Sequence, residues 1–336
     1  FPVDHSALSL SFSHRYYSMC VTVIYIPLML FGLLGNILTI LVVWLRPHMR
    51  TSTYLYLSSM AVSDLLILLL LPLDLYKLWR PRPWPLGDLA CKLTMFLSEC
   101  CTFCTILHIT FLSLERYLAV CWPITAKTVV TRRRTRAIIG CLWLSAAVSA
   151  APVLVMVGVE DVGGEDLGEC RCTHFAISSG LLSAMMILSN LYFLVPLCIL
   201  GLVYSLIGRT LWLRPKSSRR DQSHRNTVKM LGVIVLAFVL CWLPFHVGRT
   251  IFSLSLVFSD TYSPPDTHLY FLYYLSQYFN LVSSVLFYLS AAVNPLLYNL
   301  MSARYRHAVC SLIHTQSHTQ ARRMHTLTVH HSTTTL

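Results

Sequence analysis

The chain has 336 residues, of which 55% are hydrophobic and only 12% are charged, and its formal net charge is +12. A soluble domain has about 25% charged residues, so this composition argues against a soluble globular protein and indicates a membrane protein. The basic residues gather beside apolar segments, so the positive charge reflects membrane orientation and we expect no nucleic-acid partner.

Seven apolar runs are long enough to cross a lipid bilayer, which takes about 20 helical residues. In chain order they cover residues 20–45, 54–73, 93–114, 137–159, 175–207, 230–247 and 270–301. The fifth and seventh runs contain no Asp, Glu, Lys or Arg, whereas a soluble core helix would need a polar face. We therefore predict an all-α membrane protein, with an outer N-terminal tail over residues 1–17 and a seven-transmembrane helix bundle over residues 18–301.

Loop charges predict the orientation of these spans. Most of the 26 Lys and Arg residues follow spans one, three, five and seven, whereas acidic residues gather in the loop after span four. Positively charged loops favour the cytoplasmic side, so the N-terminus is expected outside and the C-terminus inside. The protein is accordingly predicted to be a multi-pass protein of the plasma membrane.

Three of the twelve cysteines lie toward the outer side of the predicted membrane: Cys91 at the start of span three, and Cys170 and Cys172 in the acidic loop. An oxidising compartment favours a disulfide bond between Cys91 and this loop, and either loop cysteine can supply the second sulfur. The cysteines inside the spans are interpreted as small apolar packing residues.

Several charged residues lie inside the predicted spans, where charges are costly and usually mark function. Glu115 and Arg116 lie at the cytoplasmic end of span three, where a simple interfacial ion pair is the alternative interpretation. Asp64 lies about 15 Å into span two, where a lone carboxylate needs polar partners.

Glu99 and Arg249 are predicted at similar depths in the outer half of the bundle. Glu99 lies about 12 Å inward of Cys91, and Arg249 lies roughly 10 Å outward of Trp242. An acid and a base at matched depth should pair, or each should meet a charged group of a ligand. A purely structural ion pair is the alternative, and Asp74 adds a second acidic group near the outer end.

Five short motifs occur in order, each in a different expected span. They are GN at 35–36, MAVSD at 60–64, ERY at 115–117, CWLPFH at 241–246 and NPLLY at 294–298. Together they resemble the rhodopsin-like (class A) G-protein-coupled receptors over nearly the whole chain. The resemblance implies a receptor, not an enzyme, that acts on a heterotrimeric G protein and is regulated by receptor kinases and arrestin.

By this resemblance, particular residues acquire roles in activation and ion binding. The implied activation switch comprises Glu115, Arg116, Tyr117, Ile106, Pro196, Tyr204, Phe238, Trp242, Pro244, Asn294, Pro295 and Tyr298. The implied polar cavity, which can hold an allosteric sodium ion, comprises Asn36, Asp64, Thr105, Ser290 and Asn294. Pro244 permits a helix kink that lets the inner end of span six swing outward. No other cofactor or metal is expected.

Missing residues narrow the ligand class. A retinal pigment needs a Schiff-base lysine in span seven, but no lysine follows Lys229. Receptors for biogenic amines carry an aspartate where this chain has Ser98. A transporter, the competing class of membrane protein, would show inverted repeats or paired broken spans, and neither is visible in the sequence.

Longer stretches resemble the ghrelin and motilin receptor subfamily. They include SECCTFCTILHIT at 98–110, ECRCTHFAISSGLL at 169–182, YSLIGRTLW at 204–212 and LCWLPFHVGR at 240–249. The short loop over residues 161–173 favours the ghrelin branch, which implies an acylated peptide hormone such as ghrelin or a growth hormone secretagogue, and signalling through Gq. A related peptide such as motilin is the alternative.

The same resemblance implies a ligand-binding set and some departures from the family. The set comprises Asp74, Glu99, Phe245, Arg249, Gln277, Asn280 and Phe287. Cys172 is an additional thiol, and of the two loop cysteines we favour Cys170 as the partner of Cys91. The third outer loop, between Arg249 and Gln277, looks longer than in the family, which could change the choice of ligand.

The cytoplasmic end predicts a surface helix and a disordered tail. Apolar residues recur with helical spacing over residues 302–313, which predicts an amphipathic helix on the inner membrane surface. Residues 314–336 are rich in Ser, Thr and His and are predicted to be disordered, with hydroxyl groups available to kinases and arrestin. The terminal TTL matches a ligand of PDZ domains.

The inner end of span six offers no acid to hold Arg116. Asp221 is expected to lie in the preceding loop, and His224, Arg225 and Lys229 would repel the arginine. Glu115 is then the remaining acid that can hold Arg116 in a resting receptor. We therefore expect measurable signalling without agonist.

Overall fold

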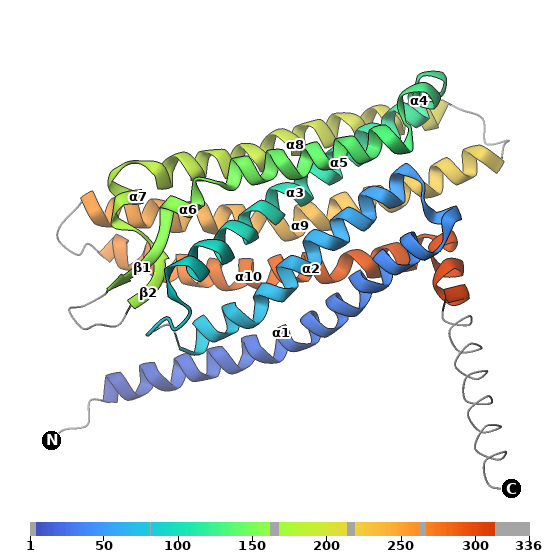
Figure 1. The fold of residues 1–336 in the computed structure, drawn as a ribbon. Coiled ribbons are helices and arrows are strands. Elements are labelled where there is room, and N and C mark those ends of the chain that lie inside the picture. Colours follow the sequence, from blue (N-terminus) through green and yellow to red (C-terminus); the bar gives the residue numbers. More distant parts are fainter. Residues whose placement is uncertain (1–4, 81, 162–167, 214–218, 262–266, 313–336) are drawn as a thin grey trace, which may run out of the picture.

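A bundle of long helices forms the computed structural model, which describes residues 5–80, 82–161, 168–213, 219–261 and 267–312. The helices run side by side, and α1 begins at the end of the bundle opposite to that where α10 finishes (Figure 1). The long helices are α1 (His5–Leu45), α2 (Ser52–Trp79), α3 (Gly87–Cys121), α5 (Arg132–Ala150), α8 (Leu181–Leu213), α9 (Arg219–Thr261) and α10 (Thr267–Met301). The predicted fold class, a seven-helix bundle, is confirmed.

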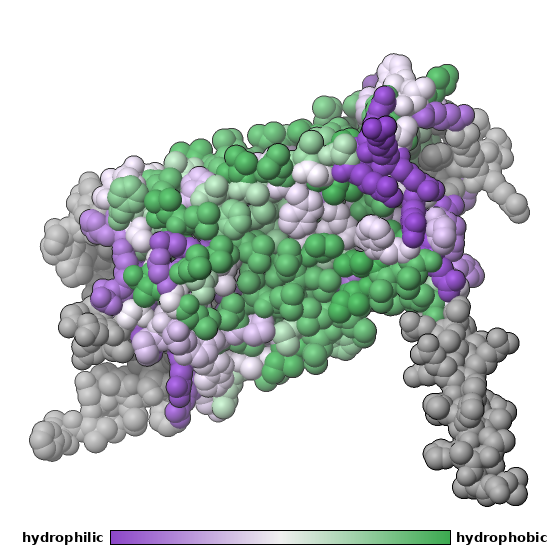
Figure 2. All heavy atoms as spheres, viewed as in Figure 1, coloured by the Kyte–Doolittle hydropathy of each residue, from purple (hydrophilic) through white to green (hydrophobic). Residues whose placement is uncertain are grey.

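The outer surface of the bundle is suited to a bilayer. Six described helices are long and apolar enough to cross a membrane, and the number rises to seven if Val282–Asn299 and the bent continuation Ala303–Leu312 are taken together. Hydrophobic side chains cover the middle of the visible face, whereas hydrophilic ones gather toward its two ends (Figure 2). On α1, for example, Phe31 and Leu34 are exposed. The chain is a multi-pass membrane protein.

Between α5 and α8 the chain forms short elements that the apolar pattern does not reveal. They are α6 (Val153–Met156), the strands β1 (Val157–Asp161) and β2 (Gly168–Cys172), and α7 (His174–Ser178). The strands are antiparallel, with Val159 opposite Cys170. The predicted fourth run, to residue 159, therefore extends too far, because its last residues form strand hydrogen bonds. The fifth run likewise starts too early, since α8 begins at Leu181.

Close packing between α1 and α10 explains the glycine of the GN motif. A Cβ atom at Gly35 would lie 2.8 Å from Cβ of Pro295, so a larger residue would force these helices apart. The neighbouring Asn36 donates a hydrogen bond of 2.9 Å to the carbonyl oxygen of Ala291 on α10. The motif therefore brings α1 against α10 and links the two by a buried hydrogen bond.

At the end of the bundle where α1, α3 and α10 finish, the described residues form three shorter elements, namely the 3₁₀ helix η1 (Pro47–Met49), α4 (Pro123–Val129) and a helix over Ala303–Leu312. The last of these bends by 92° from the preceding helix and buries Tyr305, Ala308, Val309 and Leu312. It docks through a hydrogen bond of 2.9 Å between the hydroxyl groups of Tyr305 and Thr39. Ile313 and the tail 314–336, with its predicted PDZ ligand, lie outside the described residues.

Two expected boundaries differ from the structure. Helix α1 begins at His5, so the described part of the expected N-terminal tail is helical. Helix α9 begins at Arg219, so Asp221 lies in the helix and not in the loop before it. At the starts of both helices, the helical hydrogen bonds continue into polar residues. A search for apolar runs cannot detect such polar helix ends.

Candidate ligand pocket and activation switch

The acid and base predicted at matched depth form an ion pair in the outer half of the bundle. Arg249 Nη1 on α9 lies 2.5 Å from Glu99 Oε2 on α3. Glu99 is buried, and the side chain of Arg249 is 24% exposed. The second carboxylate oxygen, Glu99 Oε1, is buried and has no hydrogen-bond partner among the described residues. One oxygen of this carboxylate is therefore buried and unsatisfied, the kind of group that gains most from a new donor.

An aromatic cluster lies deeper, between α9 and α10. The rings of Phe245 and Phe287 stack with centroids 5.5 Å apart, and Trp242 meets each of them edge to face at 5.5 Å. His246 stacks on Phe193 at 4.7 Å. This cluster, defined by Trp242, Phe245, His246 and Phe287, lies inward of the Glu99 ion pair and is largely buried, with Phe245 its partly exposed member.

The other predicted ligand residues are only partly described. Asp74 accepts a hydrogen bond from the hydroxyl group of Tyr288, a residue that the sequence analysis did not select. Lys77, one helical turn further outward on α2, lies over the ring of Trp84 at 5.1 Å from its centroid. Gln277 and Asn280 lie in α10, but their side chains are outside the described part of the structure.

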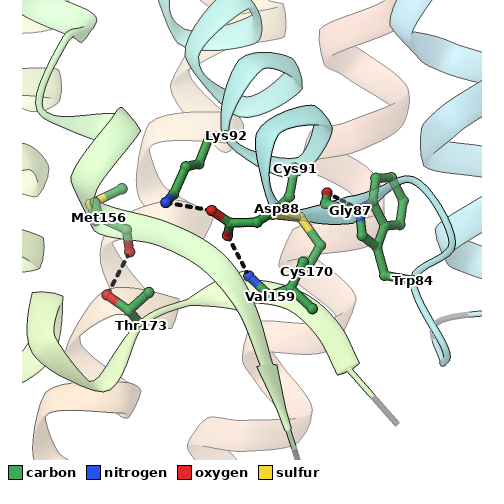
Figure 3. Close-up of polar contacts among 9 residues, drawn as sticks. All are labelled: Trp84, Gly87, Asp88, Cys91, Lys92, Met156, Val159, Cys170 and Thr173. Carbon is green, nitrogen blue, oxygen red and sulfur yellow. Dashed lines mark hydrogen bonds and ion pairs between the residues drawn. A yellow bond between two sulfur atoms is a disulfide. The ribbon is translucent and has the colours of Figure 1, made fainter.

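The outer hairpin, β1 and β2, is bound to the start of α3. A disulfide bond joins Cys91 to Cys170 (Figure 3). The predicted pairing of Cys91 with Cys170 is thus confirmed. Cys172 remains a free thiol that packs against an apolar cluster. Burial raises the pKa of the Cys172 thiol. A protonated thiol is a poor nucleophile, so Cys172 is badly suited to exchange with the neighbouring disulfide.

The residues predicted to form a polar cavity come from four helices. Asn294 donates a hydrogen bond of 2.9 Å to Asp64, whereas Thr105 pairs at 2.9 Å with Ser63, which the sequence analysis did not select. Thr105, Ser290 and Asn294 line a small cavity that Trp242 also borders. Asn36 Oδ1 is buried without a partner among the described residues. A free amide oxygen and a buried carboxylate are the hard ligands that suit a sodium ion.

Several residues of the predicted switch are buried near the aromatic cluster. Phe238 lies 5.8 Å from Phe193 and 6.0 Å from Trp242, measured between ring centroids. Ile106 and Pro196 are also buried. The carbonyl oxygen of Pro244 accepts a hydrogen bond of 2.9 Å from Ser283, which links α9 to α10 beside the proline.

Nearer the end of the bundle where α3 and α10 finish, the tyrosines of the switch have unequal surroundings. Tyr298, in the segment that also contains Pro295, is fully buried, and its hydroxyl group has no partner among the described residues. The Tyr204 hydroxyl lies 3.5 Å from Ser113 Oγ. Tyr117 accepts a hydrogen bond of 3.4 Å from Trp122 Nε1. The free hydroxyl group of Tyr298 is therefore available for a different contact if the helices rearrange.

Glu115 and Arg116 do not pair in the part of the chain that the structure describes. The Glu115 carboxylate instead accepts hydrogen bonds from Ser52 at 2.5 Å, Tyr56 at 3.1 Å and Thr135 at 3.3 Å. Arg116 Nε is buried without a hydrogen-bond partner. The expectation that Glu115 holds Arg116 thus differs from the structure, because hydroxyl groups of α2 and α5 occupy both carboxylate oxygens.

At the inner end of α9, Arg225 contacts α8. Its Nη2 donates a hydrogen bond of 2.6 Å to the carbonyl oxygen of Leu211. Leu211 lies in the last turn of α8, where carbonyl groups lack helical partners and the helix dipole favours a cation. Arg225 therefore caps α8 rather than only repelling Arg116, as the sequence analysis assumed.

A family model described as 7 transmembrane receptor (rhodopsin family) matches residues 35–298. The chain belongs to this family. This receptor is 53% identical over 302 residues to growth hormone secretagogue receptor type 1 of Sus scrofa, and 52% identical over 302 residues to that of Homo sapiens. Over 342 residues it is 42% identical to the motilin receptor of Homo sapiens. Each match covers 87% of this chain and 80% of the relative.

These relatives place the receptor in the ghrelin and motilin receptor subfamily, as predicted. The receptor is therefore not an enzyme, and the family assignment decides against the transporter alternative. Sequence reasoning did not select Ser52, Tyr56 and Thr135 around Glu115, or Tyr288 beside Asp74. Hydroxyl residues are common within spans, and their spacing does not indicate which carboxylate they face.

Proposed function

We propose that this receptor is activated by a peptide hormone carrying a fatty acyl chain, of the ghrelin type. The observation that carries the proposal is the Glu99–Arg249 ion pair, in which one buried carboxylate oxygen has no partner among the described residues, so a donor group of the ligand would satisfy it. The aromatic cluster inward of this pair supports the proposal, because its aromatic rings suit contact with an acyl chain that enters beside the partly exposed Phe245. Relatives over most of the chain are growth hormone secretagogue receptors, which supports the same ligand class.

We further propose that the receptor lies in the plasma membrane with its N-terminus outside, and signals through a Gq-type G protein to phospholipase C and calcium. The disulfide-bonded hairpin lies at the same end of the bundle as the start of α1, and disulfides persist in the extracellular compartment. Kinases and arrestin would then act on the opposite, cytoplasmic end. Measurable basal activity is supported by Arg116, which makes no ion pair with Glu115 in the described structure.

A sodium ion is the one cofactor included in the proposal. Asp64, Asn36 and Ser290 would supply its oxygen ligands, and the bound ion would favour the resting arrangement of the helices around Asp64 and Asn294. The orphaned amide oxygen of Asn36 supports this assignment.

A calcium-release assay in cells expressing the receptor tests the proposed ligand. Acylated ghrelin, the same peptide without its acyl group, and motilin are applied separately to receptor-expressing and mock-transfected cells at matched concentrations. We expect a response to the acylated peptide at concentrations at least about tenfold lower than to either of the others, a difference of about 1.4 kcal/mol. Equal responses to the acylated and unacylated peptides would contradict the acyl-chain assignment. A response to motilin alone would favour the second ligand class, which the 42% identity to a motilin receptor supports.

A further inference from the structure

The outer hairpin is attached to α3 by two contacts of different chemical kinds (Figure 3). Cys91 is bonded to Cys170 on β2, and Asp88 Oδ1 accepts a hydrogen bond of 3.0 Å from the backbone N–H of Val159 on β1. Val159 and Cys170 are directly opposite one another in the strand register. Asp88 and Cys91 are three residues apart on α3 and so share one face of the helix. Neighbouring side chains of α3 thus hold both strands at the same register position.

Lys92 orients the Asp88 carboxylate without contacting the strand itself. Its Nζ lies 2.5 Å from Asp88 Oδ2, in an i,i+4 arrangement within α3. The other oxygen, Oδ1, is thereby directed to the N–H of Val159. The ion pair is exposed to solvent, so its own contribution to stability is small, and its main effect is on the direction of the carboxylate.

Gly158 permits the close approach of β1 to Asp88. A Cβ atom at this position would lie 3.0 Å from Asp88 Oδ1 and 3.3 Å from Thr173 Cγ2. Any larger residue would push the strand away from the carboxylate or displace the side chain of Thr173. Glycine in a strand is usually unfavourable, and here the close contact with Asp88 gives it a reason.

We propose that Asp88 is a positioning residue, a tether that fixes β1, the strand facing the Cys91–Cys170 disulfide, against α3 and thereby slows the release of the peptide ligand. The disulfide, the hydrogen bond from the N–H of Trp84 to the carbonyl oxygen of Gly168, and the Arg82–Glu169 ion pair all hold β2, so β1 could still move relative to α3. A hydrogen bond to the facing strand removes that freedom. The inference rests on the proposed function because a peptide that reaches Glu99, about 12 Å inward of Cys91, must pass this hairpin.

Five variants distinguish loss of the hydrogen bond to β1 from loss of charge. Asp88→Ala removes the acceptor, and Gly158→Ala crowds the Asp88 carboxylate, so that the strand or the carboxylate must shift, without changing any charge. Asp88→Asn keeps an acceptor oxygen for Val159 but loses the ion pair, and Lys92→Met loses only the ion pair. Asp161→Ala, at the exposed end of β1, is the matched control for removing one acidic charge from the hairpin.

Two measurements are made on purified full-length receptor with intact disulfide. The first is hydrogen–deuterium exchange of the segment 157–161 without ligand. The second is the dissociation rate of a fluorescent acylated peptide, with maximal G-protein activation recorded alongside. We expect Asp88→Ala and Gly158→Ala to increase both rates about three- to fivefold, the effect of losing one solvent-exposed hydrogen bond, without lowering maximal activation. Asp88→Asn, Lys92→Met and Asp161→Ala should stay within about twofold of wild type.

Several outcomes would overturn the tether. One is wild-type exchange and dissociation in Asp88→Ala; another is an Asp88→Asn variant that behaves like Asp88→Ala, which would assign the effect to the Lys92 ion pair. If Gly158→Ala does not reach the membrane, the comparison of the two Asp88 variants decides alone. Faster exchange with unchanged peptide dissociation would refute the link to ligand release. If the wild type binds no acylated peptide, the proposed function fails, whereas the exchange data still decide whether Asp88 holds the hairpin.

Discussion

Removing the charge of Glu99 should weaken the response to peptide far more than breaking an exposed ion pair. In Glu99→Gln, the guanidinium group of Arg249 stays in the outer bundle and faces a neutral amide in place of a carboxylate 2.5 Å away. Loss of one partner from a buried, hydrogen-bonded charge pair costs about 2–5 kcal/mol. Because the side chain of Arg249 is 24% exposed, water compensates part of this cost, and we expect about 2–3 kcal/mol.

Most of this energy affects the free and the bound receptor alike, and the peptide loses mainly its hydrogen bond to the charged Glu99 carboxylate, worth about 1.5–3 kcal/mol. That loss corresponds to roughly 10- to 150-fold in peptide affinity. The measurement is displacement of a labelled acylated peptide from intact cells, together with its potency in calcium release at matched surface expression. Arg249→Gln should give a loss of similar size, since it leaves the buried Glu99 carboxylate without its partner. The double variant Glu99→Gln/Arg249→Gln should lose less than the sum of the single variants, because two neutral amides can hydrogen-bond to each other.

The exposed ion pair of Arg82 with Glu169, at 2.8 Å, is the matched control. Its side chains are 43% and 27% exposed, so Arg82→Gln should change affinity by less than about fivefold, equivalent to at most about 1 kcal/mol. Additive effects of the Glu99 and Arg249 changes would show that the two residues act independently. Unchanged affinity in both single variants would refute the assignment of the pocket.

Three further predictions concern the loop cysteines and basal signalling. Cys170→Ala should abolish binding of peptide at the cell surface, whereas Cys172→Ala should have a milder effect; the opposite order in a binding assay would reassign the disulfide. Because burial raises the pKa of the Cys172 thiol, its labelling by a water-soluble maleimide should be slow near neutral pH and accelerate as pH rises toward that pKa; a rate independent of pH would contradict this. Basal inositol phosphate production should exceed that of mock-transfected cells. It should fall in His224→Glu, which adds an acid at the start of α9, and in the double variant Ser52→Ala/Tyr56→Phe, which removes the two α2 hydroxyl donors that hold Glu115 away from Arg116. Production at the mock level in the wild type, or no fall in either variant, would refute this account.

The number and order of the spans could be read from the sequence because each transmembrane helix satisfies its own backbone hydrogen bonds, so the length of an apolar run is nearly sufficient evidence. The same regular rise along a helix gave comparable depths for Glu99 and Arg249, and the structure pairs them. Hydropathy was less informative at the ends of the runs. The strand Val157–Asp161 is apolar enough at its start to extend the fourth run, although its backbone pairs with residues 168–172.

Sequence by itself therefore determined the helical class, the family motifs and the depth of each charged residue along its own helix. The tertiary structure alone decided which side chains face one another, because this depends on the rotation and lateral position of helices that are far apart in the chain. Glu115 meets Ser52, Tyr56 and Thr135 instead of its neighbour Arg116, and Asp74 meets Tyr288. Asp88 reaches Val159 for the same reason: α3 and the hairpin are brought together by packing and a disulfide, which no local periodicity encodes.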